Sequence, residues 1–251
     1  MKKYKFWLAF AIIISFFISS INVYAYGFGY QRSKNHGLPN IGKYKEILDK
    51  NDAYYVGDTN SNKIYLTFDC GYENGYTLDI LKVLKEKNVK ATFFVTGHYL
   101  KSSKDIVLKM IEEGHIIANH TNKHRHLTKS NKEEIIEDVK TLEEMYKELT
   151  GNDITPLYRP PAGEFDDRSL SYIKDLGYKT LFWSIAYKDW DCEQAVDVTV
   201  SNLEKELHNG AIILLHAVSK TNSLMLDKFI DKARTNGYEF GETTDFLGNS
   251  F

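Results

Sequence analysis

Residues 64–71 read Ile64-Tyr65-Leu66-Thr67-Phe68-Asp69-Cys70-Gly71, an apolar run that ends in an aspartate and a glycine turn. Such a run predicts a buried strand over Ile64–Phe68. Similar short runs follow at Ala91–Thr96, His115–Asn119, Leu157–Arg159, Thr180–Ser184, Ala211–His216 and, more weakly, Tyr238–Phe240. Segments with helical spacing lie between them, so the alternation predicts an α/β fold in which a parallel sheet is covered by helices. About seven such units favour a (β/α) barrel over an open sheet.

One predicted helix, Lys132–Leu149, has a clear helical period of apolar residues, and Ser130 with Glu133 predicts a capping box at its start. In a parallel barrel, functional groups gather at the C-terminal ends of the strands. The polar clusters described below all follow predicted strands, so we expect them to meet.

The bulk composition is that of a soluble protein with one domain. The chain has 251 residues, 26% of them charged, and a formal net charge of -2. Acidic and basic residues are interleaved, so no nucleic-acid partner is expected. We expect residues 63–251 to form the catalytic domain, residues 26–62 to form a polar, irregular extension that wraps it, and the protein to be a monomer.

The N-terminus has the pattern of a targeting segment. Lys2, Lys3 and Lys5 precede an apolar run from Phe6 to Ile18, and Val23-Tyr24-Ala25 matches a cleavage site. Residues 1–25 are therefore predicted to be a signal peptide or, alternatively, an uncleaved membrane anchor. Both interpretations place the rest of the chain outside the cytoplasmic membrane.

Two clusters carry candidate chemistry before any family is considered. Asp69, at a strand end beside a glycine turn, is placed to act as a general base or a ligand, although an aspartate there can also cap the next helix. His120 and His124 are four residues apart, a spacing that presents two imidazoles to one metal ion if the segment is helical. His126 is predicted to be a bystander.

Three further clusters are less specific when taken alone. In Arg159-Pro160-Pro161-Ala162-Gly163 the prolines and glycine predict a stiff turn, which could hold Arg159 inward and aim a backbone N–H at a substrate oxygen. The turn could equally be structural, with Arg159 on the surface. Asp189-Trp190 and the strand that ends in His216 are more often structural than catalytic.

Taken in order, the five clusters resemble the polysaccharide deacetylase (NodB homology) family. Its motifs T-F-D-D-G, H-[ST]-x-x-H, R-x-P-x-G, D-W and L-x-H correspond to Thr67–Gly71, His120–His124, Arg159–Gly163, Asp189-Trp190 and Leu214–His216. The resemblance implies a distorted (β/α) barrel with about seven parallel strands. It also implies metal-dependent hydrolysis of acetyl groups on polysaccharides.

The resemblance also implies a role for each matching residue. A divalent ion, expected to be zinc, would be bound by His120 and His124. Asp69 would take a proton from water, and Arg159 would keep it oriented and ionised. His216 would protonate the departing amine, with Asp189 orienting it. The remaining assigned residues would contact substrate: Ala162 through its N–H, and Trp190, Leu214 and Tyr72 as walls.

Cys70 departs from the family pattern, in which this position is an aspartate that binds the metal. A thiolate can bind zinc, so a Cys-His-His site is chemically reasonable. Alternatively Cys70 does not bind, and two histidines with waters hold the ion weakly. A third possibility is oxidation, for example to a disulfide with Cys192.

The residues from Thr67 through Tyr72 to Thr77 are similar to those of the muramic acid deacetylases of spore-forming bacteria. This similarity implies de-N-acetylation of N-acetylmuramic acid in peptidoglycan glycan strands stripped of stem peptides. The reaction would take place in the cell wall or the forespore intermembrane space, and its product would lead to the muramic δ-lactam of spore cortex. Two alternatives remain: a deacetylase of N-acetylglucosamine polymers, and a catalytically silent wall-binding barrel.

Overall fold

The computed structural model describes residues 25–32, 35–190 and 193–248. Apart from Ala25, the predicted signal peptide or anchor lies outside these residues, and so does Cys192. Within the described ranges no helix has the length and apolar character needed to cross a membrane.

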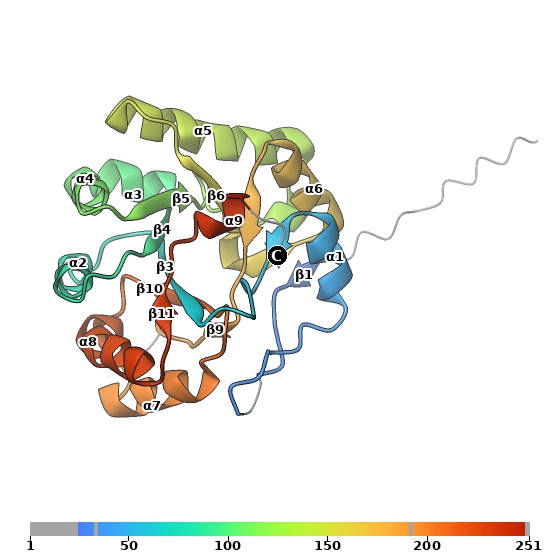
Figure 1. Cartoon of the computed structure of the whole chain (residues 1–251). Coiled ribbons are helices and arrows are strands. Elements are labelled where there is room, and N and C mark those ends of the chain that lie inside the picture. Colours follow the sequence, from blue (N-terminus) through green and yellow to red (C-terminus); the bar gives the residue numbers. More distant parts are fainter. Residues whose placement is uncertain (1–24, 33–34, 191–192, 249–251) are drawn as a thin grey trace, which may run out of the picture.

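A parallel sheet forms the centre of the molecule (Figure 1). Its strands lie side by side in the order β2 (Ala53–Tyr54), β8 (Lys179–Leu181), β6 (Thr155–Tyr158), β5 (Ile116–Asn119), β4 (Thr92–Val95), β3 (Lys63–Cys70), β10 (Ile212–His216) and β9 (Ile185–Ala186), and β11 (Glu239–Phe240) also pairs with β3. A bridge between Val56 and Ala211 links the segment after β2 to the start of β10. The predicted (β/α) barrel is confirmed, with nine sheet strands in the described residues instead of about seven.

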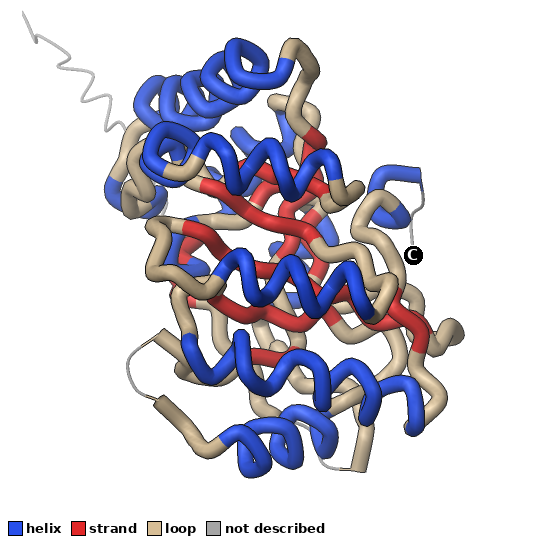
Figure 2. Tube along the Cα trace, turned by 90° about the vertical axis from the view of Figure 1, so that its left-hand side faces the viewer, coloured by secondary structure: helices blue, strands red, loops and turns tan. Residues whose placement is uncertain are grey.

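Helices cover the outer face of this sheet, as Figure 2 shows for the side turned toward the viewer. In chain order the helices are α1 (Tyr44–Lys50), α2 (Thr77–Glu86), α3 (Gly97–Ser102), α4 (Lys104–Glu112), α5 (Lys132–Thr150), α6 (Asp167–Asp175), α7 (Val196–Glu206), α8 (Lys220–Thr235) and α9 (Asp245–Gly248). The short α9 is not part of the outer layer, because its Phe246 packs against Tyr65 on the opposite face of the sheet. Two 3-10 turns lie at Leu127–Lys129 and Pro161–Gly163, and β1 (Tyr26–Gly27) pairs antiparallel with β7 (Glu164–Phe165).

Strand β3 explains how the sequence builds both faces of the sheet. Ile64, Leu66 and Phe68 are fully buried in the main core between sheet and helices. Tyr65 belongs to a second core cluster on the opposite face, as the two-residue period of a strand requires. The same alternation decides where the polar residues at the end of β3 point.

Two local expectations from the sequence were wrong. The capping box of α5 is formed by Asn131 and Glu134, because the hydroxyl of Ser130 instead donates to the carbonyl of His126 at 3.2 Å. The segment 26–62 is not irregular throughout, since it contains α1 and β2. Strand β2 joins the sheet edge, where the N–H of Phe182 donates to the carbonyl of Tyr54 at 2.7 Å.

Candidate active site

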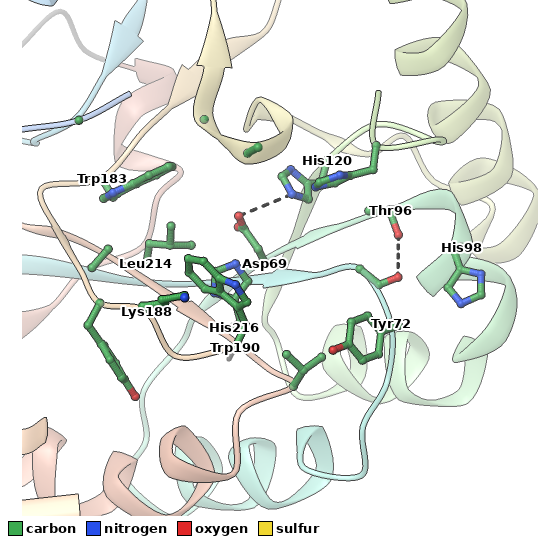
Figure 3. Close-up of a pocket in the computed structure, with 18 of the residues that line it drawn as sticks. Asp69, Tyr72, Thr96, His98, His120, Trp183, Lys188, Trp190, Leu214 and His216 are labelled. Carbon is green, nitrogen blue, oxygen red and sulfur yellow. Dashed lines mark hydrogen bonds and ion pairs between the residues drawn. The ribbon is translucent and has the colours of Figure 1, made fainter. Parts of the chain in front are cut away.

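A cavity of about 1140 Å³ opens where several strands of the sheet end (Figure 3). Asp69 enters it from the end of β3, His120 from just after β5, and His216 from the last position of β10. These are the C-terminal ends of parallel strands, where functional groups of barrels gather. The expected meeting of the polar clusters at one edge is therefore found.

Asp69 is held by a buried ion pair with Arg159. Nη1 of Arg159 donates to Oδ1 of Asp69 at 2.8 Å, while Nε and Nη2 donate to the carbonyls of Leu181 and Phe182. Burial favours the neutral carboxyl, but the charges of Arg159 and His216 and the hydrogen bond from Arg159 outweigh it and lower the pKa of Asp69. Arg159 is fully buried and lies over the ring of Phe94. The carboxylate is consequently ionised and fixed in orientation.

The rings of His120 and His124 lie edge to face, with centroids 4.9 Å apart. The expected helical turn between them is absent: the segment is an irregular loop in which Thr121 and His124 have left-handed backbones, with φ of 65° and 52°. The N–H of Asn122 donates to the carbonyl of Asp138, and that of His124 to the hydroxyl of Thr121, and these bonds hold the loop. The two imidazoles are therefore brought together by the loop conformation and not by a helical turn.

His216 is held by Asp189. Nδ1 of His216 lies 2.7 Å from Oδ1 of Asp189, and the backbone N–H of His216 donates to Oδ2 at 2.7 Å. Burial by itself lowers the pKa of His216, but the hydrogen bond and charge of Asp189 outweigh it, so the pKa is raised. With Nδ1 bound to the carboxylate, Nε2 is the ring nitrogen left to meet a substrate.

The remaining assigned residues form the cavity walls. Ala162 lines it with a left-handed backbone at φ 53°, within the turn that the two prolines begin. Leu214 is buried two positions before His216 on the same strand face, and the ring of Trp190 contacts that of His216 with centroids 5.0 Å apart. Trp190 and Tyr72 are both more than half exposed and line the cavity.

Cys70 does not reach the cavity. It is fully buried in the main core, because it follows Asp69 in the strand and its side chain points to the opposite face. Burial first, then the charges of Asp69 and Glu73, raise the pKa of this thiol well above its usual range. Since metals bind the thiolate, the expected Cys70 ligand has neither the position nor the ionisation it needs.

The imidazoles of His120 and His124 remain as candidate donors for a divalent ion. Nδ1–H of His120 donates to the carbonyl of Arg159 at 2.8 Å, so Nε2 carries the lone pair and lies 3.6 Å from Oδ2 of Asp69. A hydrogen bond from the other ring nitrogen to a carbonyl is typical of metal-binding histidines. Burial lowers the pKa of His120 to about 4 and also lowers that of His124, which keeps both rings in the neutral form that binds metals. Across the described ranges no three His, Cys, Asp or Glu side chains form a complete ligand set.

Several residues that line the cavity or hold its lining in place were missed from the sequence. Gly29, Tyr30 and Arg32 come from the N-terminal extension, where the hydroxyl of Tyr30 accepts the N–H of Ala186 at 2.8 Å. Asn222 of α8 donates to Oδ2 of Asp189 at 2.5 Å. No family motif marks these positions, and only long-range packing brings them to the site. His126, as expected, lies outside the cavity lining and pairs with Glu164.

Comparisons with known proteins match this chain to a family model and to several relatives. The family model for polysaccharide deacetylase matches residues 56–181. The peptidoglycan-N-acetylmuramic acid deacetylase PdaA of Bacillus subtilis is 40% identical over 222 residues, which cover 87% of this chain and 84% of that protein. Its solved structure, a family 4 carbohydrate esterase, matches with a TM-score of 0.86 and covers 89% of this chain and 97% of that one.

Other relatives are similar over much of the chain. An uncharacterized 30.6 kDa protein of Geobacillus stearothermophilus is 44% identical, covering 87% of this chain and 84% of the relative. A peptidoglycan-N-acetylglucosamine deacetylase of Bacillus cereus is 33% identical, covering 77% of this chain and 71% of the relative. The relatives thus include enzymes named for each of the two amino sugars of peptidoglycan.

Proposed function

The chain belongs to the polysaccharide deacetylase family, and from this premise we propose that it removes the N-acetyl group of N-acetylmuramic acid in peptide-stripped peptidoglycan. It is a hydrolase of amide C–N bonds. The products are acetate and a glycan amine, which can close onto the lactyl carboxyl as the muramic δ-lactam of spore cortex. The protein acts outside the cytoplasmic membrane, as a monomer.

One observation carries the proposal. A buried carboxylate fixed by a cation, Asp69 with Arg159, and an imidazole fixed by an anion, His216 with Asp189, lie at the same cavity. The first pair lowers the pKa of the proposed base, and the second raises the pKa of the proposed acid. Amide hydrolysis needs both, one to activate water and one to protonate the leaving amine.

The residues of this chain divide the reaction as follows. Asp69 accepts a proton from the water that attacks the acetyl carbon. The backbone N–H of Ala162 donates to the resulting oxyanion. His216 gives its Nε2 proton to the amine nitrogen as the C–N bond breaks, so acetic acid and a neutral amine leave, and the acid then loses its proton to solvent as acetate. His120 and His124 would hold a divalent ion, which would supply polarisation of the acetyl oxygen and of the attacking water.

The walls exclude water and align the sugar. Leu214 is buried beside His216, and Trp190 packs against the His216 ring, so both contact the methyl side of a bound acetyl group. The exposed ring of Tyr72 offers an apolar face to the next sugar. Acid and base groups of this kind each contribute about 10²–10⁴-fold to rate.

The test is mass spectrometry of purified peptidoglycan fragments after incubation with the protein, zinc and a thiol reductant. Peptide-free fragments should lose acetyl groups from muramic acid and release acetate in equal amount. The Asp69→Asn variant is the matched control, since it keeps the side-chain shape and removes the base. Acetyl loss from glucosamine alone would favour the activity for which the Bacillus cereus relative is named. No release under any condition would favour a silent wall-binding barrel.

A further inference from the structure

The side chain of Asn222 lies behind the proposed acid, and no reaction step has used it. Asn222 is in the first turn of α8, is fully buried and does not line the cavity. Its Nδ2 donates to Oδ2 of Asp189 at 2.5 Å and to the carbonyl of His216 at 3.0 Å, and its Oδ1 accepts the hydroxyl of Tyr187. A buried amide is costly unless its polar atoms are bonded, and both ends of this amide are.

The partners of the Asn222 amide determine its orientation. The Asp189 carboxylate and the His216 carbonyl are acceptors, so both must face the NH₂ group. If the amide were turned over, its oxygen would face these acceptors with no hydrogen between them. The hydroxyl of Tyr187 then donates to Oδ1, and Tyr187 itself lines the cavity. Asn222 therefore links a cavity wall to both residues of the acid pair.

The helix does not require this side chain. The N-cap of α8 is Ser219, whose hydroxyl accepts the backbone N–H of Asn222 at 3.3 Å. An apolar residue suits a buried helical position better than asparagine, and α8 has apolar residues at its buried positions Met225 and Leu226. The amide is therefore explained by the groups that it bonds and not by the helix that carries it.

Asn222 supports the geometry on which the acid depends. Oδ2 of Asp189 accepts two N–H groups, one from Asn222 and one from the backbone of His216 at 2.7 Å, and these bonds fix the plane of the carboxylate. Oδ1 is left to meet Nδ1 of His216 at 2.7 Å. Hydrogen bonds weaken steeply at poor angles, so a carboxylate that could rotate would hold the ring less well.

Three charged residues act on the ring of His216. Burial lowers its pKa, the hydrogen bond and charge of Asp189 and then the charge of Asp69 raise it, and the charge of Arg159 lowers it. Asp189 contributes more than either of the others, and it is the one that Asn222 bonds. A change at Asn222 should therefore reach the His216 ring through Asp189.

We propose that Asn222 is a positioning residue for the reaction, which fixes the Asp189 carboxylate so that His216 keeps Nδ1 on that carboxylate and Nε2 free for the departing amine. This inference rests on the proposed function, in which His216 protonates the amine. Tyr187 takes part through its hydroxyl, because that bond fixes the orientation of the Asn222 amide.

The test replaces Asn222 by leucine, which has a similar size and leaves little room for a water to restore the lost bonds. In Asn222→Leu, kcat for acetate release from peptide-free muramyl fragments should fall about 10-fold, part of the about 10²–10⁴-fold that a general acid contributes. KM should change little, because Asn222 does not line the cavity.

NMR titration of the His216 ring gives a second measurement that does not depend on activity. The ring signals of His216 are identified by their loss in His216→Gln. In Asn222→Leu the pKa of His216 should be lower than in the wild-type protein, because Asp189 no longer holds the ring as well. Tyr187→Phe keeps the aromatic ring and should lower this pKa by a smaller amount.

Asn51→Leu is the matched control. Asn51 is also a buried amide, and it donates to the carbonyl of Ile47 and to Oδ1 of Asp167, both at 2.8 Å, but it lies outside the cavity lining. This variant should lower the free energy of unfolding, as Asn222→Leu does, without changing kcat or the pKa of His216.

The outcomes separate the inference from the function on which it rests. If Asn222→Leu folds and has the kcat and the His216 pKa of the wild-type protein, the positioning role is overturned. If Asn222→Leu does not fold, an unchanged His216 pKa in Tyr187→Phe overturns it instead. If the wild-type protein releases no acetate while the pKa of His216 still falls in the variants, the deacetylase proposal fails and the role of Asn222 stands.

Discussion

Asp69 and His216 are register partners on the neighbouring parallel strands β3 and β10. Adjacent strands lie about 4.8 Å apart, so the proposed base and acid reach the cavity from neighbouring positions. Arg159 approaches from the turn after β6, and Asp189 from the loop after β9. The oppositely charged partners shift the two pKa values apart although the groups are close, lowering that of Asp69 and raising that of His216.

Replacing Asp69 by asparagine should lower kcat/KM for acetate release about 10²–10⁴-fold, because the base is lost while the fold is kept. The measurement is steady-state acetate release from peptide-free fragments, with circular dichroism to check folding. Asp153→Asn, which removes an exposed carboxylate, serves as the control and should leave the rate unchanged. A rate in Asp69→Asn near that of the wild-type protein would remove Asp69 from the reaction.

Replacing Asp189 by asparagine should move the basic limb of the pH profile to lower pH. The carboxylate raises the pKa of His216, so its loss lets burial lower that pKa. A general acid is active only below its pKa, so activity then falls at a lower pH as the pH rises. Measuring kcat/KM across pH for both proteins checks this. An unshifted basic limb in the variant would mean that another group donates the proton.

Replacing Arg159 by leucine should destabilise the fold by about 3–5 kcal/mol, the usual cost of leaving one half of a buried pair without its partner. The substitution leaves Asp69 and the carbonyls of Leu181 and Phe182 without their donors. Urea unfolding, with the midpoint and slope fitted separately, gives the change in free energy. Arg168→Leu, at a partly exposed arginine that pairs with Asp166, should cost much less. Comparable losses in the two variants would contradict the buried pair's structural role.

Replacing Cys70 by alanine should leave metal binding unchanged, since the thiol lies in the core and its pKa is raised. His124→Ala should abolish stoichiometric binding, because one of two imidazole ligands is lost. Zinc bound per protein, measured by atomic emission after dialysis, distinguishes the cases. A further check is thiol labelling in a Cys192→Ser background, where Cys70 should react only after unfolding. If Cys70→Ala loses zinc, the Cys70 thiolate is a metal ligand after all.

The sequence predicted the sheet well because its strands are short apolar runs bounded by turns, a local signal. All seven expected strands are present, and Asp69, His120, Arg159 and His216 converge as their strand ends imply. The motif order also identified the family, which the comparisons confirm.

The features that the sequence did not predict depend on side-chain directions, backbone angles and contacts between distant residues. Cys70 looks like a ligand by position, but strand alternation turns it away from its neighbour Asp69. His120 and His124 meet through left-handed residues, and a four-residue spacing does not reveal backbone angles. Asn222 reaches Asp189 from a helix 33 positions further along the chain, and no local pattern marks it.

The segment that carries Tyr30 and Arg32 has a consequence for how such enzymes diversify. The hydroxyl of Tyr30 accepts the N–H of Ala186, and the guanidinium of Arg32 donates to the carbonyl of Ala186. Ala186 lies outside β3 and β10, the strands that pair Asp69 with His216. Insertions or substitutions there can reshape the mouth of the cavity while the strand register stays the same. Substrate range and bond-breaking chemistry can therefore evolve separately in this architecture, the first through the leading segment and the second through the barrel.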